Sequence, residues 1–158
     1  MESMVQKAER EFVGLLDLYK ELLDVSNQID KCLKQRDWQA LEDNICSQAA
    51  IQKNIDEHRI DIDQLQASFC SELGMENFDL AALERRFPDT KLGNILTQLM
   101  DVMAKLESKA ASNEKRLRLM ISEVQLERGD LQKGQKAAKA YQPKPSSWQD
   151  GRFVDEKK

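Results

Sequence analysis

The residue types that most often carry enzyme chemistry are few in this chain, and their spacing does not suit a catalytic or metal site. His58 is the only histidine, and its neighbours at helical spacing, Asn54 and Asp61, do not form the Glu-x-x-His pairs that hold iron in helical bundles. The sequence contains neither a Gly-x-Ser-x-Gly motif nor a glycine-rich phosphate loop. We therefore expect a protein that is not an enzyme and that has no catalytic residue, no metal site and no cofactor.

The three cysteines do not form a redox or metal-binding motif. Cys32, Cys46 and Cys70 include no Cys-x-x-Cys pair, and their odd number leaves at least one thiol outside any disulfide. Such cysteines are typical of reduced thiols that pack as small hydrophobic side chains. The N-terminus has no basic-then-apolar leader, and no apolar run approaches the roughly 20 residues that cross a bilayer. We expect a cytoplasmic protein without a secretion signal and without membrane insertion.

Apolar side chains, in contrast, recur regularly from about Lys91 to Lys133. Thr90 is a suitable helix N-cap, and Pro88 ends the segment before it. The apolar positions follow one another at three or four residues, or at multiples of these steps, which places them on one narrow stripe of a long helix. A stripe of this width is typical of a coiled-coil seam. Its members are Leu92, Ile95, Leu99, Val102, Leu106, Leu117, Met120, Val124 and Leu131, with Ala110 and Asn113 in the weaker middle.

Two helices should precede this stretch and form a hairpin. The first is predicted from Glu2 to Gln35, because its apolar residues keep a heptad spacing without a break. Asp37 is a good N-cap for a second helix, which is predicted from Trp38 to about Gly74. Since the connection is so short, the two helices are expected to lie antiparallel.

The rest of the chain is expected to add a short helix and a tail. Leu80, Leu83 and Phe87 have the spacing of a connector helix that caps the bundle. Ala137, Ala138 and Ala140 could extend the long helix as a frayed end, whereas prolines, serines and a glycine near the C-terminus favour irregular structure. The sequence therefore predicts an all-α fold, an elongated antiparallel hairpin plus one long helix in a coiled-coil-like bundle. We expect a bundle domain over residues 1–133 and a flexible basic tail over residues 134–158.

The tail also differs from the bundle in charge and in aromatic content. Residues 133–158 carry 7 Lys and Arg against 3 Asp and Glu, a net charge of +4, and residues 1–132 therefore carry −8. An acidic body does not favour a nucleic-acid partner. Tyr141, Trp148 and Phe153 are three of the nine aromatic residues of the chain. They indicate either a tail that folds back on the bundle or a peptide that docks on another protein.

The long helix is expected to be longer than either of its partners, so the end of its stripe would face water unless something covers it. The residues concerned are Leu117, Met120, Ile121, Val124 and Leu131. An uncovered apolar stripe is a docking site for another amphipathic helix, and flexible side chains such as Met100 and Met103 adapt to varied partners. The tail or a second copy of the chain would also suffice as a cover.

Two sequence features are typical of one known family. The first is a hairpin with a leucine-rich helix around residues 15–23, a charged Arg36-Asp37 turn and a leucine-poor helix that begins at Trp38. The second is an asparagine in the long helix followed by apolar residues at helical spacing. These residues are Asn113, Leu117, Met120 and Ile121. With both features the chain resembles, over residues 10–130, the flagellar export chaperones of the FlgN type, and chaperones of the FliT type share this build.

The resemblance implies a non-catalytic chaperone of the bacterial cytoplasm. Such proteins bind the amphipathic terminal helices of hook-associated proteins of the FlgK and FlgL type, prevent their premature assembly and deliver them to the type III export gate. We expect cargo to bind at Asn113, Leu117, Met120, Ile121, Val124 and Leu131. We expect an export component to dock at Tyr141, Trp148 and Phe153. The alternative is a self-associating helical scaffold, a homodimer without cargo that uses the same stripe.

Overall fold

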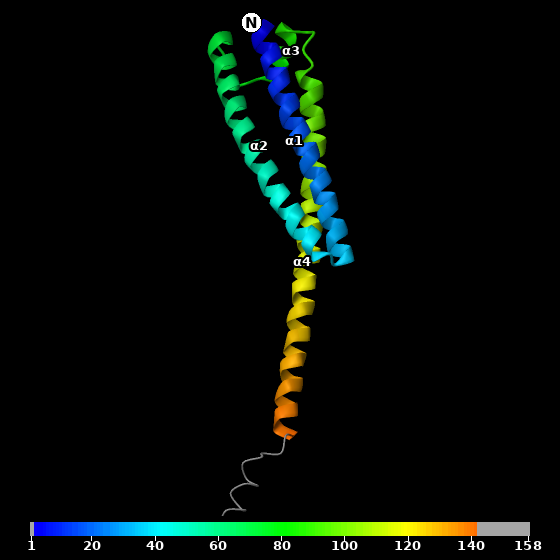
Figure 1. The fold of residues 1–158 in the computed structure, drawn as a ribbon. Helices are drawn as coiled ribbons and strands as arrows, with labels where there is room; N and C mark the ends of the chain where they lie inside the picture. The colour runs from blue at the N-terminus through cyan, green and yellow to red at the C-terminus, as the bar shows by residue number, and fades with distance from the viewer. Residues whose placement is uncertain (1, 142–158) are drawn as a thin grey trace, which may run out of the picture. The chain divides into compact units, whose positions relative to one another are not determined.

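The computed structural model describes residues 2–141, and every regular element in this part of the chain is a helix (Figure 1). The helices are α1 (Glu2–Gln35), α2 (Trp38–Leu73), α3 (Leu80–Arg86) and α4 (Leu92–Tyr141). The predicted all-α class and the order of two long helices, one short helix and one long helix are thereby confirmed. The chain divides into two compact units, Met1–Leu117 (unit 1) and Arg118–Lys158 (unit 2), and α4 contributes residues to both.

A tight turn joins α1 and α2 into the antiparallel hairpin of unit 1 (Figure 1). Arg36 adopts a left-handed conformation with φ 55°, which reverses the chain directly after α1. The side chain of Asp37 accepts a hydrogen bond from the amide of Ala40 at 3.1 Å, so the predicted N-cap of α2 is confirmed. At its other end α2 stops at Gly74, whose φ of 64° is readily adopted by glycine.

The hairpin has a point of close approach at Gly14 of α1. A Cβ atom at this position would lie 3.1 Å from Cε1 of His58 on α2, which is tighter than an ordinary van der Waals contact. Glycine therefore lets the imidazole ring rest against the backbone of α1. The Nδ1 atom of the same ring lies 3.4 Å from Oε2 of Glu11. The single histidine of the chain is thus placed between two helices as a packing residue.

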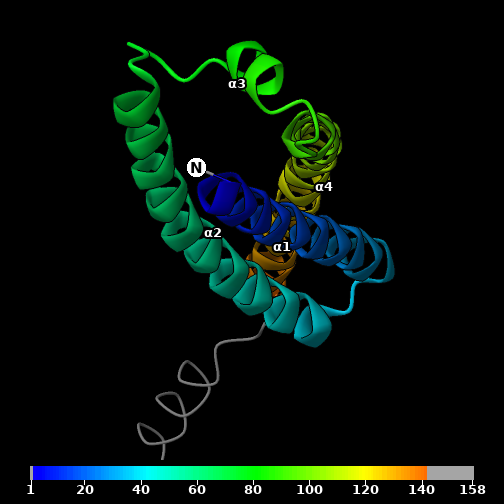
Figure 2. The same cartoon turned by 90° about the horizontal axis from the view of Figure 1, so that it is seen from above.

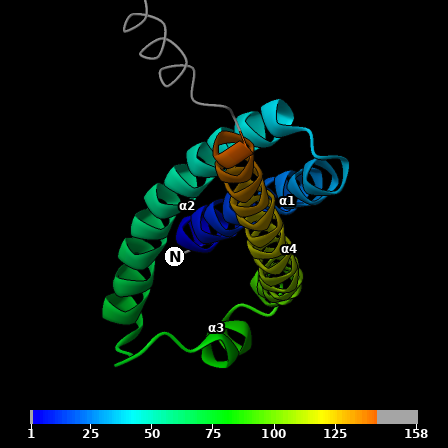
Figure 3. The same ribbon diagram turned by 90° about the horizontal axis from the view of Figure 1, so that it is seen from below.

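The short helix α3 lies between the end of α2 and the start of α4 (Figures 2 and 3). Asp79 caps it by accepting a hydrogen bond from the amide of Ala81 at 3.0 Å. Leu83 is fully buried and anchors α3 on the core. Phe87 follows the helix as its C-cap, and its amide donates to the carbonyl of Leu83 at 2.8 Å. The predicted connector helix is confirmed, one residue shorter than the spacing of its apolar residues indicated.

The N-terminus of α4 is held by a carboxylate from α1. Oε1 of Glu9 accepts hydrogen bonds from the hydroxyl of Thr90 at 2.9 Å and from the amide of Lys91 at 2.7 Å. The same threonine oxygen accepts from the amide of Leu92 at 3.3 Å, as expected of the predicted N-cap. A negative charge at this end also interacts favourably with the helix dipole. Glu9 therefore fixes where α4 begins against α1.

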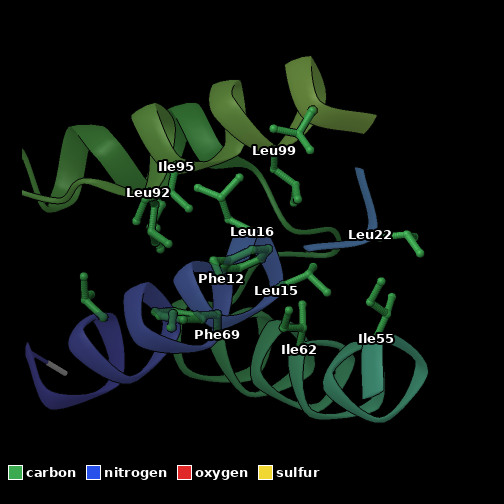
Figure 4. Close-up of a cluster of buried hydrophobic side chains, with 14 residues drawn as sticks. Phe12, Leu15, Leu16, Leu22, Ile55, Ile62, Phe69, Leu92, Ile95 and Leu99 are labelled. Atoms are coloured by element: carbon green, nitrogen blue, oxygen red, sulfur yellow. The ribbon is translucent and has the colours of Figure 1, made fainter. Parts of the chain in front are cut away.

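The core of unit 1 joins one face from each long helix (Figure 4). Phe69, Leu83 and Leu92 are its largest fully buried side chains, and the ring of Phe69 packs edge-on against Phe78 with centroids 6.3 Å apart. Because burial of each large apolar side chain stabilises the fold by about 1.5–3 kcal/mol, this cluster holds the helices together. The side chains labelled in Figure 4 are Phe12, Leu15, Leu16, Leu22, Ile55, Ile62, Phe69, Leu92, Ile95 and Leu99.

The helix α4 continues past the end that the sequence predicted. It was expected to finish near Lys133, yet it runs to Tyr141 through both Gly129 and Gly134. One glycine inside a helix costs only about 1 kcal/mol, and the residues after Gly134 are mostly Ala, Lys and Gln, which are strong helix formers. Residues 134–141 are therefore helical rather than irregular, and the remainder of the predicted tail lies outside the described residues.

Candidate partner-binding surface

Asn113 is a buried residue of unit 1 and uses its side chain within that unit. It lies on α4, and its Nδ2 atom donates a hydrogen bond to the backbone carbonyl of Ser26 on α1 at 2.9 Å. Its Oδ1 atom is also buried and has no hydrogen-bond partner among the described residues. The residue predicted to mark the cargo site is thus placed at the contact between α1 and α4.

A cluster of charged side chains surrounds Asp30 close to this contact. Asp30 is buried on α1, and its carboxylate lies 2.7 Å from Nζ of Lys34, 3.5 Å from Nζ of Lys109 and 3.6 Å from Nε of Arg116. The hydrogen bond from Lys34 lowers the pKa of Asp30, and the positive charges of Lys109 and Arg116 lower it further, although burial opposes them. The cluster therefore links α4 to α1 through one ionised carboxylate.

An apolar groove lies between α1 and α4 in unit 1. Its walls combine Tyr19 of α1 with two exposed methionines, Met100 and Met103, on α4. Its lining residues are Tyr19, Met100, Met103, Ala104, Leu106, Glu107 and Ala110. The methionines singled out in the sequence as adaptable therefore do lie on a surface.

The predicted cargo residues of unit 2 divide into one buried and three exposed side chains. Met120 is buried. Ile121, Val124 and Leu131 are 49%, 53% and 64% exposed, and we name these three the first strip. In unit 1, Leu117 is also exposed, at 37%. Within unit 2 the described residues form only the last part of α4, so no second described element covers the first strip there.

A second set of exposed apolar side chains lies on a different face of α4 in unit 2. Leu119 and Leu126, which we name the second strip, are 57% and 71% exposed. They are seven residues apart, so they lie one above the other on the helix. The predicted stripe does not include them, because it follows a single apolar face of the helix. Their seven-residue spacing was the signal that would have found them.

The three aromatic residues expected to contact an export component are described only in part. Tyr141 is the last residue of α4 and is exposed. Trp148 and Phe153 lie outside the described residues. The structure thus presents one of the three residues at the surface.

Side chains that could hold a metal ion do not gather in the described part of the chain. Over residues 2–141, no group of three or more His, Cys, Asp and Glu side chains is arranged to hold a metal ion. The three cysteines are free, with Cys32 buried, Cys46 exposed and Cys70 half-buried. None of the helices described in this chain combines the length and the apolar character that a bilayer crossing requires.

Comparisons with family models, with curated proteins and with solved structures found no match for this chain. The resemblance to export chaperones therefore depends on the sequence features of the hairpin and of residues 113–121. The geometry of the described residues adds two exposed apolar strips on one helix.

Proposed function

We propose that this chain is a non-catalytic export chaperone of the bacterial cytoplasm. It would bind the amphipathic terminal helices of hook-associated flagellar proteins, prevent their early assembly and deliver them to the type III export gate. One observation carries the proposal together with the resemblance to the FlgN type. The first strip, Ile121, Val124 and Leu131, is exposed on a helix that no other described element of unit 2 covers. Exposed apolar side chains in a row favour the docking of an amphipathic helix.

The number of exposed anchors sets the affinity that this surface supports. Burial of Ile121, Val124 and Leu131 at about 2 kcal/mol each would supply roughly 6 kcal/mol. A micromolar complex needs a binding free energy of about 8 kcal/mol, and association itself costs at least about 4 kcal/mol. The first strip alone therefore falls short of micromolar affinity, and a client would need further contacts on the chain.

Calorimetry with the terminal helices of a hook-associated protein tests the proposal. We expect the full chain to bind these helices with micromolar or tighter affinity. We expect the double variant Ile121→Glu with Val124→Glu to lose about tenfold or more, because two charges would then lie in the apolar contact. Both side chains are about half exposed, so the variant should keep the fold.

The matched control is Gln52→Glu with Gln64→Glu, which adds the same charge at exposed polar positions of α2, outside unit 2. Its affinity should remain within about twofold of the wild type, since surface substitutions away from a contact have small effects. An affinity that the strip variant leaves unchanged would remove the first strip from the cargo site. Absence of binding by the wild type would refute the chaperone proposal.

Self-association is the second candidate, and the heptad spacing of Leu117, Val124 and Leu131 favours it. A second copy of the chain would then cover the first strip. Sedimentation velocity distinguishes the two functions. A tight dimer that Ile121→Glu with Val124→Glu dissociates would support the scaffold, whereas a monomer at micromolar concentration would leave the strip free for a client.

A further inference from the structure

The two apolar strips of unit 2 lie on nearly opposite sides of α4. A helix turns by about 100° per residue, so Leu119 and Ile121, two positions apart, are separated by about 160° around its axis. The same step separates Val124 from Leu126. All four of these side chains are about half exposed or more. One amphipathic helix covers a face of roughly 100°, so a single docked helix would leave one strip in water.

The polar edges between the strips differ in charge. Glu123, Glu127 and Asp130 lie on one edge, and Arg118, Gln125, Gln132 and Lys133 lie on the other. Arg128 lies within the first strip, and all these side chains are exposed. An acidic edge beside an apolar contact favours a partner helix that carries Lys or Arg at the facing positions. The charge pattern therefore selects the side on which a partner places its basic residues.

We propose that the partner of unit 2 presents two amphipathic helices at once, one on each strip, with basic residues beside Glu127 and Asp130. The inference rests on the proposed function, because it describes the client of the same site. The second pair of anchors, Leu119 and Leu126, provides the additional contacts that the first strip lacks. A two-fold dimer fits less well, since it pairs the same patch on both subunits and would cover one strip only.

The test uses the full chain and three probes in calorimetry. The probes are the two terminal helices of a hook-associated protein joined by a flexible linker, and each helix alone. We expect the linked pair to bind at least about tenfold more tightly than either single helix. We expect Leu119→Glu with Leu126→Glu to weaken the linked pair by about tenfold or more. The same variant should leave unchanged the affinity for the single helix that binds the first strip.

The possible results of this experiment distinguish the two-helix client from the proposed chaperone function. Gln52→Glu with Gln64→Glu on α2 is again the matched control, and circular dichroism should show that both variants remain equally helical. If the linked pair binds the Leu119→Glu, Leu126→Glu variant as tightly as it binds the wild type, the two-helix client is refuted. The chaperone proposal is not affected by that result. Absence of binding of all three probes overturns both. A wild-type dimer that this variant dissociates also overturns the inference, because the second strip then serves a second copy.

The acidic edge is tested separately with Glu127→Gln and Asp130→Asn together. We expect this variant to bind the linked pair several-fold more weakly at low salt and to show a shallower dependence of affinity on salt concentration. An unchanged affinity and an unchanged salt dependence would overturn the placement of basic residues on that edge.

Discussion

Asp30 is the residue of α1 that two basic side chains of α4 approach. It is buried, and Lys34, Lys109 and Arg116 lie within 3.6 Å of its carboxylate. Asn113 adds its hydrogen bond to the carbonyl of Ser26 one turn earlier on α1. A buried polar contact of this kind can fix how two apolar helices align, because any shift along the helix axis would leave its groups unpaired.

The stability of unit 1 should depend on pH through this carboxylate. The pKa of Asp30 is lowered in the folded chain, chiefly by the hydrogen bond from Lys34. Its contribution is therefore fully present above the usual aspartate pKa of about 3.9 and is lost as pH falls through that value toward the folded pKa. At pH 7, Asp30→Asn should lower the free energy of unfolding by roughly 1–3 kcal/mol.

Urea titrations of the wild type and of Asp30→Asn at pH 7, 5, 4 and 3 would measure this difference. The gap between the two proteins should be constant from pH 7 to pH 5 and should narrow below about pH 4. A gap that stays constant down to pH 3 would show that the ionised carboxylate does not contribute as described. Asp101→Asn is a suitable control, since that aspartate is exposed and pairs only locally with Lys105.

At the scale of elements, the start of α4 depends on a side chain from α1. Glu9 accepts hydrogen bonds from Thr90 and Lys91, far along the chain. We expect Glu9→Ala to lower the free energy of unfolding by about 1–2 kcal/mol, because two donors at the helix N-terminus lose their acceptor. Glu21→Ala, an exposed glutamate on the same helix, should change it by less than about 0.5 kcal/mol. Equal effects in chemical denaturation would contradict the capping role of Glu9.

The helix boundaries that local signals determine were predictable from the sequence. The predicted start and end of α1 agree with the structure, and Asp37 begins α2 as its side-chain cap indicates. The end of α4 was not predictable from glycines alone, because strong helix formers after Gly134 outweigh them. Local sequence signals were thus enough to predict both ends of α1 and the start of α2. The end of α4 depends instead on the helix propensity summed over the residues after Gly134.

The candidate surface was predictable only where a single periodic face sufficed. Ile121, Val124 and Leu131 are exposed as expected of an uncovered stripe. Asn113 was placed on the stripe, but its hydrogen bond to Ser26 could not be predicted, since it depends on which turn of α1 lies opposite and therefore on contacts distant in sequence. The exposed position of Leu119 was not predicted, because the predicted stripe follows one apolar face and Leu119 lies on the other side of the helix. The apolar periodicity of one helix face therefore predicts neither contacts between residues distant in sequence nor apolar side chains on a second face of the same helix.

At the scale of the whole molecule, the end of the chain is expected to act separately from cargo binding. Deletion of residues 142–158 removes Trp148 and Phe153 but leaves α4 and both strips complete. We expect this variant to bind the terminal helices of a hook-associated protein with unchanged affinity in calorimetry. We also expect it to reduce secretion of that protein when it replaces the full chain in a flagellated bacterium.

Two results would contradict the prediction that the end of the chain acts separately from cargo binding. Lower cargo affinity after the deletion would place part of the cargo site in residues 142–158. Normal secretion would remove the export-docking role of these aromatic residues. A variant that retains residues 142–158 but carries Trp148→Ala with Phe153→Ala provides the matched comparison.

The hydrogen bond that Thr90 donates to Glu9 joins positions 81 residues apart along the chain, and the one that Asn113 donates to Ser26 joins positions 87 residues apart. Contacts between distant positions form late, since a long loop must close first, whereas the α1–α2 hairpin closes through a short turn. During synthesis on the ribosome, the hairpin should therefore form while the face of α1 that α4 later covers is still bare. Until translation has passed Leu117, the nascent protein itself would present an uncovered apolar surface of the kind proposed for its clients.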